Sequence, residues 1–211
     1  MRLQLALDDI DINSAIGLVS KLYSYIDIIE AGTPLIKRYG VCCIRTIKDK
    51  FPDKYVVADM KTIDGGELEA SLAFESGADM MNILACASQE TILQTLNYAN
   101  KYNKHIAADL IGVVDKVSTA RNLARLGVHY IGIHTGVDEQ AAGKTPLEDL
   151  IAISRSVNIP IIVAGGISVD TISEIRKYNP EIIIVGSALT KSDNPEISAK
   201  LIHDCIKHGS R

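Results

Sequence analysis

The feature that most constrains the fold of this chain is a series of eight short apolar runs separated by segments with a different periodicity. The runs are nearly continuous in Ile, Val, Leu and Ala, which is typical of parallel strands buried on both faces. They occupy residues 3–7, 26–30, 55–59, 80–84, 105–110, 129–134, 160–164 and 182–185. The segments between them have apolar residues at helical spacing, so the sequence predicts one helix after each strand.

The number of strand–helix units distinguishes between two α/β architectures. Eight units in 211 residues, or about 26 residues each, favour a closed (β/α)8 TIM barrel. An open doubly wound sheet usually has fewer strands, and the chain has no Gly-x-Gly-x-x-Gly turn after its first strand. Because 47% of the residues are hydrophobic, we expect one compact domain over residues 1–211 with a large core.

The charge balance excludes several classes of partner. The chain has 22 Lys and Arg against 26 Asp and Glu, for a formal net charge of -4, and the basic residues do not cluster. We therefore expect neither nucleic-acid binding nor attachment to an anionic membrane. The first residues resemble no signal peptide, and no window approaches the roughly 20 apolar residues of a membrane span. The sequence predicts a cytoplasmic protein that binds a small polar ligand.

Ionisable residues gather where the predicted strands end. In a barrel of this type the active site lies at the carboxyl ends of the strands. The groups expected there are Asp8, Glu30, Asp59 with Lys61, Asp109 and His134. Asp59 and Lys61 are two apart, so on a regular strand they share the inward face. A single such group, Asp8 or Asp109 for example, could equally form a rim salt bridge or a helix N-cap. Six together indicate pKa values tuned for chemistry.

Two glycine-containing loops predict a phosphate site. Ala164, Gly165 and Gly166 follow the seventh strand, and Gly186 and Ser187 follow the eighth. Backbone amides of these two loops form the phosphate cradle in many such barrels. Plain tight turns are the alternative interpretation. The polar stretch 136–145 after the sixth strand is the only extended loop, and we expect it to act as a lid.

Histidines and cysteines beyond the rim are assigned no chemistry. His134 could be a buried structural histidine, but among carboxylates and beside a phosphate pocket its imidazole can move protons near pH 7. The other histidines lie at strand starts or on the last helix. No zinc-binding spacing joins the four cysteines, and only Cys86, after the fourth strand, is placed to line a site.

The motif Asp59-x-Lys61-x-x-Asp64 resembles the signature of the orotidine monophosphate decarboxylase suprafamily of ribulose-phosphate-binding TIM barrels. Within it, the stretches 3–8, 27–34, 57–61 and 134–143 are similar to those of 3-hexulose-6-phosphate synthases. The sister family, 3-keto-L-gulonate-6-phosphate decarboxylase, has Glu at the position of Asp109 and Arg at those of Val137 and Ser187. These three differences favour the synthase family.

The resemblance implies a reaction and a role for each residue. It implies that Glu30 and Asp59 bind Mg²⁺, and that Lys61 lies beside the reacting oxygens. His134 would exchange the C1 proton of ribulose 5-phosphate, giving an enediolate that adds to formaldehyde to form 3-hexulose 6-phosphate. The remaining implied roles are orientation of substrate hydroxyls and the lysine by Asp8 and Asp109, and phosphate binding by Gly166, Gly186 and Ser187. Asp64 would reach the neighbouring subunit's site, so the resemblance also implies a homodimer with shared active sites.

Three alternatives stay open at this level. The first is the sister decarboxylase, which forms the same enediolate by loss of CO₂. The second keeps the aldol outcome but makes Lys61 a Schiff-base nucleophile; its neighbours Asp59 and Asp64 argue against this, because carboxylates raise the pKa of an adjacent ammonium. The third is a sugar-phosphate-binding protein without turnover.

Overall fold

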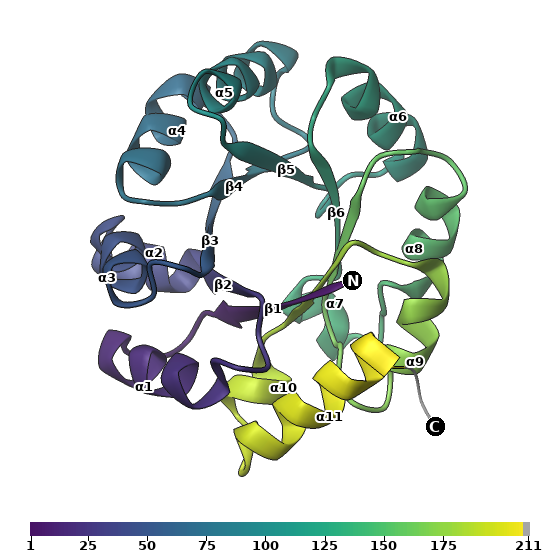
Figure 1. The fold of residues 1–211 in the computed structure, drawn as a ribbon. Helices are drawn as coiled ribbons and strands as arrows, with labels where there is room; N and C mark the ends of the chain where they lie inside the picture. The colour runs from purple at the N-terminus through teal and green to yellow at the C-terminus, as the bar shows by residue number, and fades with distance from the viewer. Residues whose placement is uncertain (209–211) are drawn as a thin grey trace.

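The strands close into a barrel. The computed structural model describes residues 1–208, and residues 209–211, the end of the expected 1–211 domain, lie outside the described part. The eight parallel strands follow one another in chain order around the barrel, and β1 pairs with β8 to close it (Figure 1). The predicted (β/α)8 TIM barrel is confirmed.

The strand positions agree closely with the apolar runs. The strands are β1 (Arg2–Leu7), β2 (Ile28–Ala31), β3 (Tyr55–Thr62), β4 (Met80–Leu84), β5 (His105–Asp109), β6 (Tyr130–His134), β7 (Ile161–Ala164) and β8 (Ile182–Val185). Two of them differ from the prediction by more than one residue at an end. β2 begins at Ile28 rather than residue 26, because the carboxylate of Asp27 accepts the Leu3 amide at 2.8 Å and precedes the regular ladder. β3 continues three residues beyond Asp59.

Helices surround the barrel on its outer side (Figure 1). They are α1 (Ile12–Leu22), α2 (Thr33–Tyr39), α3 (Cys42–Lys50), α4 (Gly66–Glu75), α5 (Gln89–Lys101), α6 (Lys116–Leu126), α7 (Val137–Ala141), α8 (Leu147–Ser154), α9 (Ile172–Ile175), the 3₁₀ turn η1 (Arg176–Tyr178), α10 (Ser187–Thr190) and α11 (Pro195–His208). Side chains of Asp11, Ser88 and Asp115 cap the amino ends of α1, α5 and α6, each satisfying amides that have no partner within the helix. The expected loop 136–145 is partly helical, since it contains α7.

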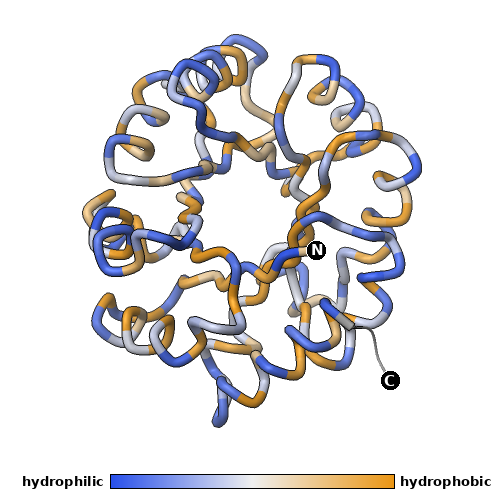
Figure 2. Tube along the Cα trace, viewed as in Figure 1, coloured by the Kyte–Doolittle hydropathy of each residue, from blue (hydrophilic) through white to orange (hydrophobic). Residues whose placement is uncertain are grey.

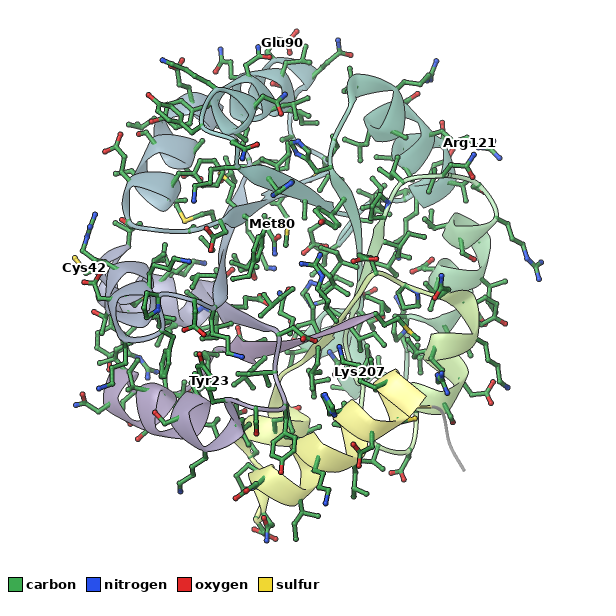
Figure 3. All side chains as sticks on the ribbon, viewed as in Figure 1. Tyr23, Cys42, Met80, Glu90, Arg121 and Lys207 are labelled. Carbon is green, nitrogen blue, oxygen red and sulfur yellow. The ribbon has the colours of Figure 1, made fainter. Side chains whose placement is uncertain are left out.

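Apolar side chains fill both sides of the strand ring. Inside it, one layer consists of Ile28, Val57, Met80, Ala107, Ile162 and Ile182. Met80 is labelled inside the ring in Figure 3, whereas Glu90 and Arg121 lie at the outer edge. A larger cluster packs between strands and helices, so the strands are largely hydrophobic in Figure 2. Burial on both faces explains the unbroken aliphatic runs.

Polar and aromatic side chains occupy the amino end of the barrel. The Arg2 guanidinium donates to the Tyr130 hydroxyl at 3.2 Å and lies 5.7 Å from the centre of the Tyr55 ring. The Tyr55 hydroxyl is 2.8 Å from His105 Nδ1. These residues come from β1, β3, β5 and β6, so they link strands across the amino end of the barrel. His105 lies there because it begins β5, the position that the sequence predicted for it.

Over residues 1–208, none of the helices combines the length and the apolar character that a membrane crossing needs.

Candidate active site

The carboxyl ends of β3, β5 and β6 bring a lysine, two aspartates and a histidine into direct contact. Lys61 Nζ lies 2.8 Å from Asp59 Oδ2 and 3.3 Å from Asp109 Oδ2. His134 Nδ1 lies 3.0 Å from the same Asp109 oxygen. Asp59 and Asp109 are each 5% exposed. The four side chains thus form one connected network at the expected end of the barrel.

Lys61 has an unusual backbone. Its φ angle is +49°, in the left-handed region that non-glycine residues rarely adopt, and the β3–β4 register shifts between Ala58 and Thr62. Such a conformation costs about 1–3 kcal/mol and concentrates at functional sites. Asp59 and Lys61 do meet, as predicted, but on an irregular strand end rather than by regular alternation.

The network fixes the charges of its members. Burial acts to lower the pKa of Lys61, but Asp59 and Asp109 outweigh it, so the pKa lies above its ordinary value. Burial acts to raise the pKa of Asp109, yet the His134 hydrogen bond and the charges of His134 and Lys61 bring it below its ordinary value. Lys61 is therefore a cation and Asp109 an anion at neutral pH.

Two further carboxyl groups lie close by on β2 and after β1. Burial raises the pKa of Glu30 well above its ordinary value, and Asp59 and Asp8 raise it further. Burial and Asp59 also raise the pKa of Asp8. Asp8 is packed against Gly32, where a Cβ would lie 2.2 Å from its Oδ1. Only glycine at position 32 leaves room for this carboxylate. The predicted rim carboxylates thus lie near one another, at the carboxyl ends of β1, β2, β3 and β5.

Three polar residues that the sequence reasoning missed hold these carboxylates. Gln4 Nε2 donates to Glu30 Oε2 at 2.5 Å, and Asn82 Nδ2 donates to Asp59 Oδ1 at 3.2 Å. Thr33 Oγ1 donates to Asp59 Oδ2 at 2.9 Å. Gln4 and Asn82 stand inside aliphatic runs, each flanked by apolar residues, and that isolated polar position is the signal that could have identified them.

The oxygen-rich arrangement fits the Mg²⁺ that the resemblance implies. Within residues 1–208, no group of three or more His, Cys, Asp or Glu side chains is arranged to hold a metal ion. Mg²⁺, however, is commonly bound by one or two carboxylates together with water and substrate oxygens. Glu30 and Asp59 supply two carboxylates, and the buried Gln4 Oε1 and Asn82 Oδ1 have no hydrogen-bond partner among residues 1–208. This donor set suits a hard cation.

The two glycine loops have the conformation that an anion site needs. Gly165 and Gly166 have φ angles of +104° and +66°, and a Cβ on Gly165 would lie 2.4 Å from the Thr135 carbonyl oxygen. Among the hydrogen bonds of residues 1–208, none has the amide of Gly166, Gly186 or Ser187 as donor. These amides are left for an acceptor such as a phosphate oxygen. Ala164, which ends β7, is nearly buried.

Asp64 is not part of this network. Its side chain is exposed and makes no hydrogen bond or ion pair with residues 1–208. Cys86 is exposed as well. Both residues therefore lie outside the contacts made by the described part of this chain's own site.

Comparisons with known proteins agree with the geometry. Residues 1–202 match the profile described as the Orotidine 5'-phosphate decarboxylase / HUMPS family. The chain belongs to this family. The 3-hexulose-6-phosphate synthase of Mycobacterium gastri, a family relative, is 40% identical over 206 residues, covering 98% of this chain and all of the relative.

Solved structures of both the synthase and the sister decarboxylase resemble this chain, and the synthase structure resembles it more. The 3-hexulose-6-phosphate synthase of Salmonella typhimurium superposes with a TM-score of 0.97 at 38% identity, covering both chains fully. The 3-keto-L-gulonate-6-phosphate decarboxylase of Vibrio cholerae gives 0.85 at 27% identity, covering 100% of this chain and 99% of that one. The resemblance to synthases is confirmed, and the chain is an enzyme of the lyase class.

Proposed function

We propose that this enzyme condenses formaldehyde with D-ribulose 5-phosphate to 3-hexulose 6-phosphate, and catalyses the reverse cleavage, through a 1,2-enediolate. The observation that carries the proposal is the single Asp109 oxygen that lies 3.0 Å from His134 Nδ1 and 3.3 Å from Lys61 Nζ. It joins a proton acceptor and a fixed cation next to a pair of buried carboxylates. The similarity to synthases supports the choice of substrate.

His134 is the general base of this proposal. Asp109 accepts a hydrogen bond from Nδ1–H of the imidazole, which leaves Nε2 unprotonated and available to the substrate. Nε2 takes the C1 proton of ribulose 5-phosphate, and the C–H electrons form the C1–C2 double bond while O2 becomes an oxyanion. C1 then attacks the formaldehyde carbon, and the new alkoxide takes up a proton. The former C2 carbonyl becomes the C3 ketone of the product.

Lys61 stabilises the oxyanion. A cation that is already held between Asp59 and Asp109 needs no reorganisation when negative charge develops, and such preorganised groups supply a large part of catalysis. Mg²⁺ bound by Glu30 and Asp59 would supply additional positive charge for the substrate oxygens. Asp8 would orient a substrate hydroxyl, and the loops after β7 and β8, with Gly166, would hold the phosphate.

The charge state of Lys61 disfavours the Schiff-base alternative. A nucleophilic lysine has to be neutral, whereas the pKa of Lys61 is raised by Asp59 and Asp109. Borohydride should therefore trap no covalent adduct with ribulose 5-phosphate, and EDTA should remove activity that Mg²⁺ restores. Inactivation by borohydride in the presence of substrate would favour the Schiff base.

The decisive assay incubates the purified protein with Mg²⁺ and ribulose 5-phosphate in ²H₂O, with and without formaldehyde. We expect exchange of the C1 proton without formaldehyde and consumption of formaldehyde when it is present. Release of CO₂ from 3-keto-L-gulonate 6-phosphate, with no use of formaldehyde, would replace the proposal by the sister activity. Binding of ribulose 5-phosphate without C1 exchange would indicate a protein that binds but does not turn over.

The proposal includes a homodimer with shared active sites. Asp64 is exposed, and near it in sequence Ile63, Leu68 and Leu72 are 52%, 66% and 43% exposed. Leu68 and Leu72 are four residues apart on α4 and therefore share one face of that helix. A contiguous exposed apolar surface is typical of an interface. Lys61→Ala and Asp64→Ala chains should each be inactive alone. Mixed one to one, they should recover about a quarter of the normal activity, because about half of the dimers are mixed and one of the two sites in each mixed dimer is intact. No recovery in a mixture shown to contain mixed dimers would refute shared sites.

We place this activity in the cytoplasm without nucleic-acid or membrane partners. Cys42, Cys43 and Cys86 carry free thiols, as is usual in reducing compartments. The formal net charge of -4 also disfavours a polyanionic partner.

A further inference from the structure

Two buried amide side chains flank the carboxylate pair of the candidate active site. Gln4, Glu30, Asp59 and Asn82 come from β1, β2, β3 and β4, which are consecutive neighbours in the barrel. The order around the wall is therefore amide, carboxylate, carboxylate, amide. Each amide donates to the carboxylate beside it, at 2.5 Å for Gln4 and 3.2 Å for Asn82.

The amides are costly to keep in this place. Gln4 is completely buried and Asn82 is 8% exposed. Each amide donates its N–H group to a carboxylate, so its carbonyl oxygen remains as an acceptor. In the described part of the chain, neither Gln4 Oε1 nor Asn82 Oδ1 has a hydrogen-bond donor. A buried acceptor without a donor destabilises the folded protein. Two at the same pair of carboxylates point to donors that come from outside the protein.

A hydrated cation supplies such donors. Mg²⁺ usually keeps several water molecules when it binds to proteins, and each water offers hydrogens to nearby acceptors. The Gln4 N–H bond goes to Glu30 Oε2, and no hydrogen bond within residues 1–208 reaches Glu30 Oε1. The Asn82 N–H bond holds Asp59 Oδ1, while Lys61 and Thr33 hold Oδ2, so the orientation of this carboxylate is fixed at both oxygens. Removal of groups that orient metal ligands in this way commonly weakens metal binding by about 10–100-fold.

We propose that Gln4 and Asn82 are positioning residues for a divalent cation: their N–H groups orient Glu30 and Asp59, and their carbonyl oxygens accept hydrogen bonds from the water that the cation retains. The inference rests on the proposed function for the identity of the cation. It adds two residues that do not contact the sugar phosphate and act through the carboxylates.

The test measures cation binding in the absence of substrate. Protein freed of divalent ions is titrated with Mn²⁺, which has a magnetic resonance signal that reports binding directly. Gln4→Met and Asn82→Leu are near-isosteric and remove both polar atoms. Each substitution should weaken Mn²⁺ binding about 10–100-fold. If one of the two variants does not fold, the Mn²⁺ affinity of the other still tests the proposal. Tyr130→Phe is the matched control, since it removes a polar atom at the other end of the barrel and should leave Mn²⁺ affinity unchanged.

A kinetic readout separates positioning from general damage. In Gln4→Met the half-saturating Mg²⁺ concentration should rise by the same factor as the Mn²⁺ dissociation constant, whereas kcat at saturating Mg²⁺ should stay within about threefold of the parent value. A merely structural role would lower kcat and leave the cation dependence unchanged. Folded variants with parental Mn²⁺ affinity would overturn the inference.

Failure of the inference and failure of the proposed function give different results. If Mn²⁺ binding by the parent protein depends on Gln4 and Asn82 but the protein does not consume formaldehyde with ribulose 5-phosphate, the function is wrong and the positioning role stands. If it consumes formaldehyde without binding Mn²⁺, the function stands and the positioning role is refuted.

Discussion

His134 Nδ1 lies 3.0 Å from Asp109 Oδ2, and this one oxygen also contacts Lys61 Nζ at 3.3 Å. The other oxygen of Asp109 accepts the backbone amide of Ile111 at 2.9 Å. Both oxygens of the carboxylate are therefore occupied, and its position is fixed from three sides. The base and the cation of the proposed reaction are held by the same side chain.

Asp109→Asn tests this shared support. The amide keeps the size of the carboxylate but removes its charge, so the preferred tautomer of His134 and the position of Lys61 are both lost. We expect kcat to fall by about 10²–10⁴, because the imidazole no longer presents a base to the substrate. Proton exchange at C1 of ribulose 5-phosphate, followed by NMR, measures the step directly. An exchange rate close to that of the parent would show that Asp109 has no role in proton transfer.

Lys61→Ala and His134→Ala should each lower turnover by about two to four orders of magnitude. Both residues lie at the rim of the barrel rather than in its core, so both variants should stay folded. The melting temperature of Lys61→Ala should nevertheless fall, because the buried carboxylates of Asp59 and Asp109 lose the cation that pairs with them. Steady-state kinetics and thermal denaturation check the two statements. His203→Ala, on α11, is the control and should keep parental activity. A near-parental rate in either rim variant would remove that residue from the mechanism.

Glu30→Gln should stabilise the cation-free protein. Because the pKa of Glu30 is raised in the folded state, its ionisation costs stability, and that cost appears as the pH rises above the ordinary value of 4.5. At pH 7.5 without divalent ions the variant should melt several degrees higher, at about 2–4 °C per kcal/mol for a chain of this size. Added Mg²⁺ should raise the melting temperature of the parent only. A lower melting temperature for the cation-free variant would contradict the argument.

Asp79→Asn should destabilise the protein, because it breaks an ion cluster outside the site. Asp79 accepts from Lys48 at 2.8 Å and from Lys104 at 3.0 Å, and although burial opposes it, these contacts lower its pKa. Its stabilisation is present above the ordinary pKa of 3.8 and is lost as the pH falls through the lower folded value. The variant should lose about 1–3 kcal/mol at pH 7, and the difference should shrink in acid. Denaturant unfolding at several pH values measures this, with the exposed Asp49→Asn as control.

Gly165→Ala should damage the anion loop. The φ angle of +104° disfavours any side chain, and the new Cβ would lie 2.4 Å from the Thr135 carbonyl oxygen. We expect a higher KM for ribulose 5-phosphate and a lower free energy of unfolding. Gly17→Ala in α1 has nothing within 4 Å of its new Cβ and should instead stabilise by about 0.5–1 kcal/mol. Unchanged KM in Gly165→Ala would exclude this loop from phosphate binding.

The sequence predicts the strands well because burial on both faces leaves a strong signal. Seven of the predicted strands begin within one residue of the observed ones, and the second differs where Asp27 makes a side-chain bond before the ladder begins. The groups at the strand ends were recognisable because a charge after an aliphatic run is conspicuous. The network of Lys61, Asp109 and His134 follows from where their strands end.

Other features depend on geometry that residue patterns do not carry. Regular alternation places Lys61 beside Asp59, but it does not reveal the left-handed backbone that the lysine adopts. Gln4 and Asn82 were missed because attention to strand ends passes over a polar residue inside a strand. The helix α7 within the predicted lid loop is only five residues long, too short for periodicity to identify.

The closed amino end of the barrel has a consequence for the order of events. Because Arg2, Tyr55, His105 and Tyr130 link the strands there, and an apolar layer lies above them, both reactants and the product have to share a single entrance at the opposite end. Once a sugar phosphate fills that entrance, the small aldehyde has no rear access. The product should therefore compete with ribulose 5-phosphate for entry, and an excess of the sugar phosphate should slow the arrival of formaldehyde.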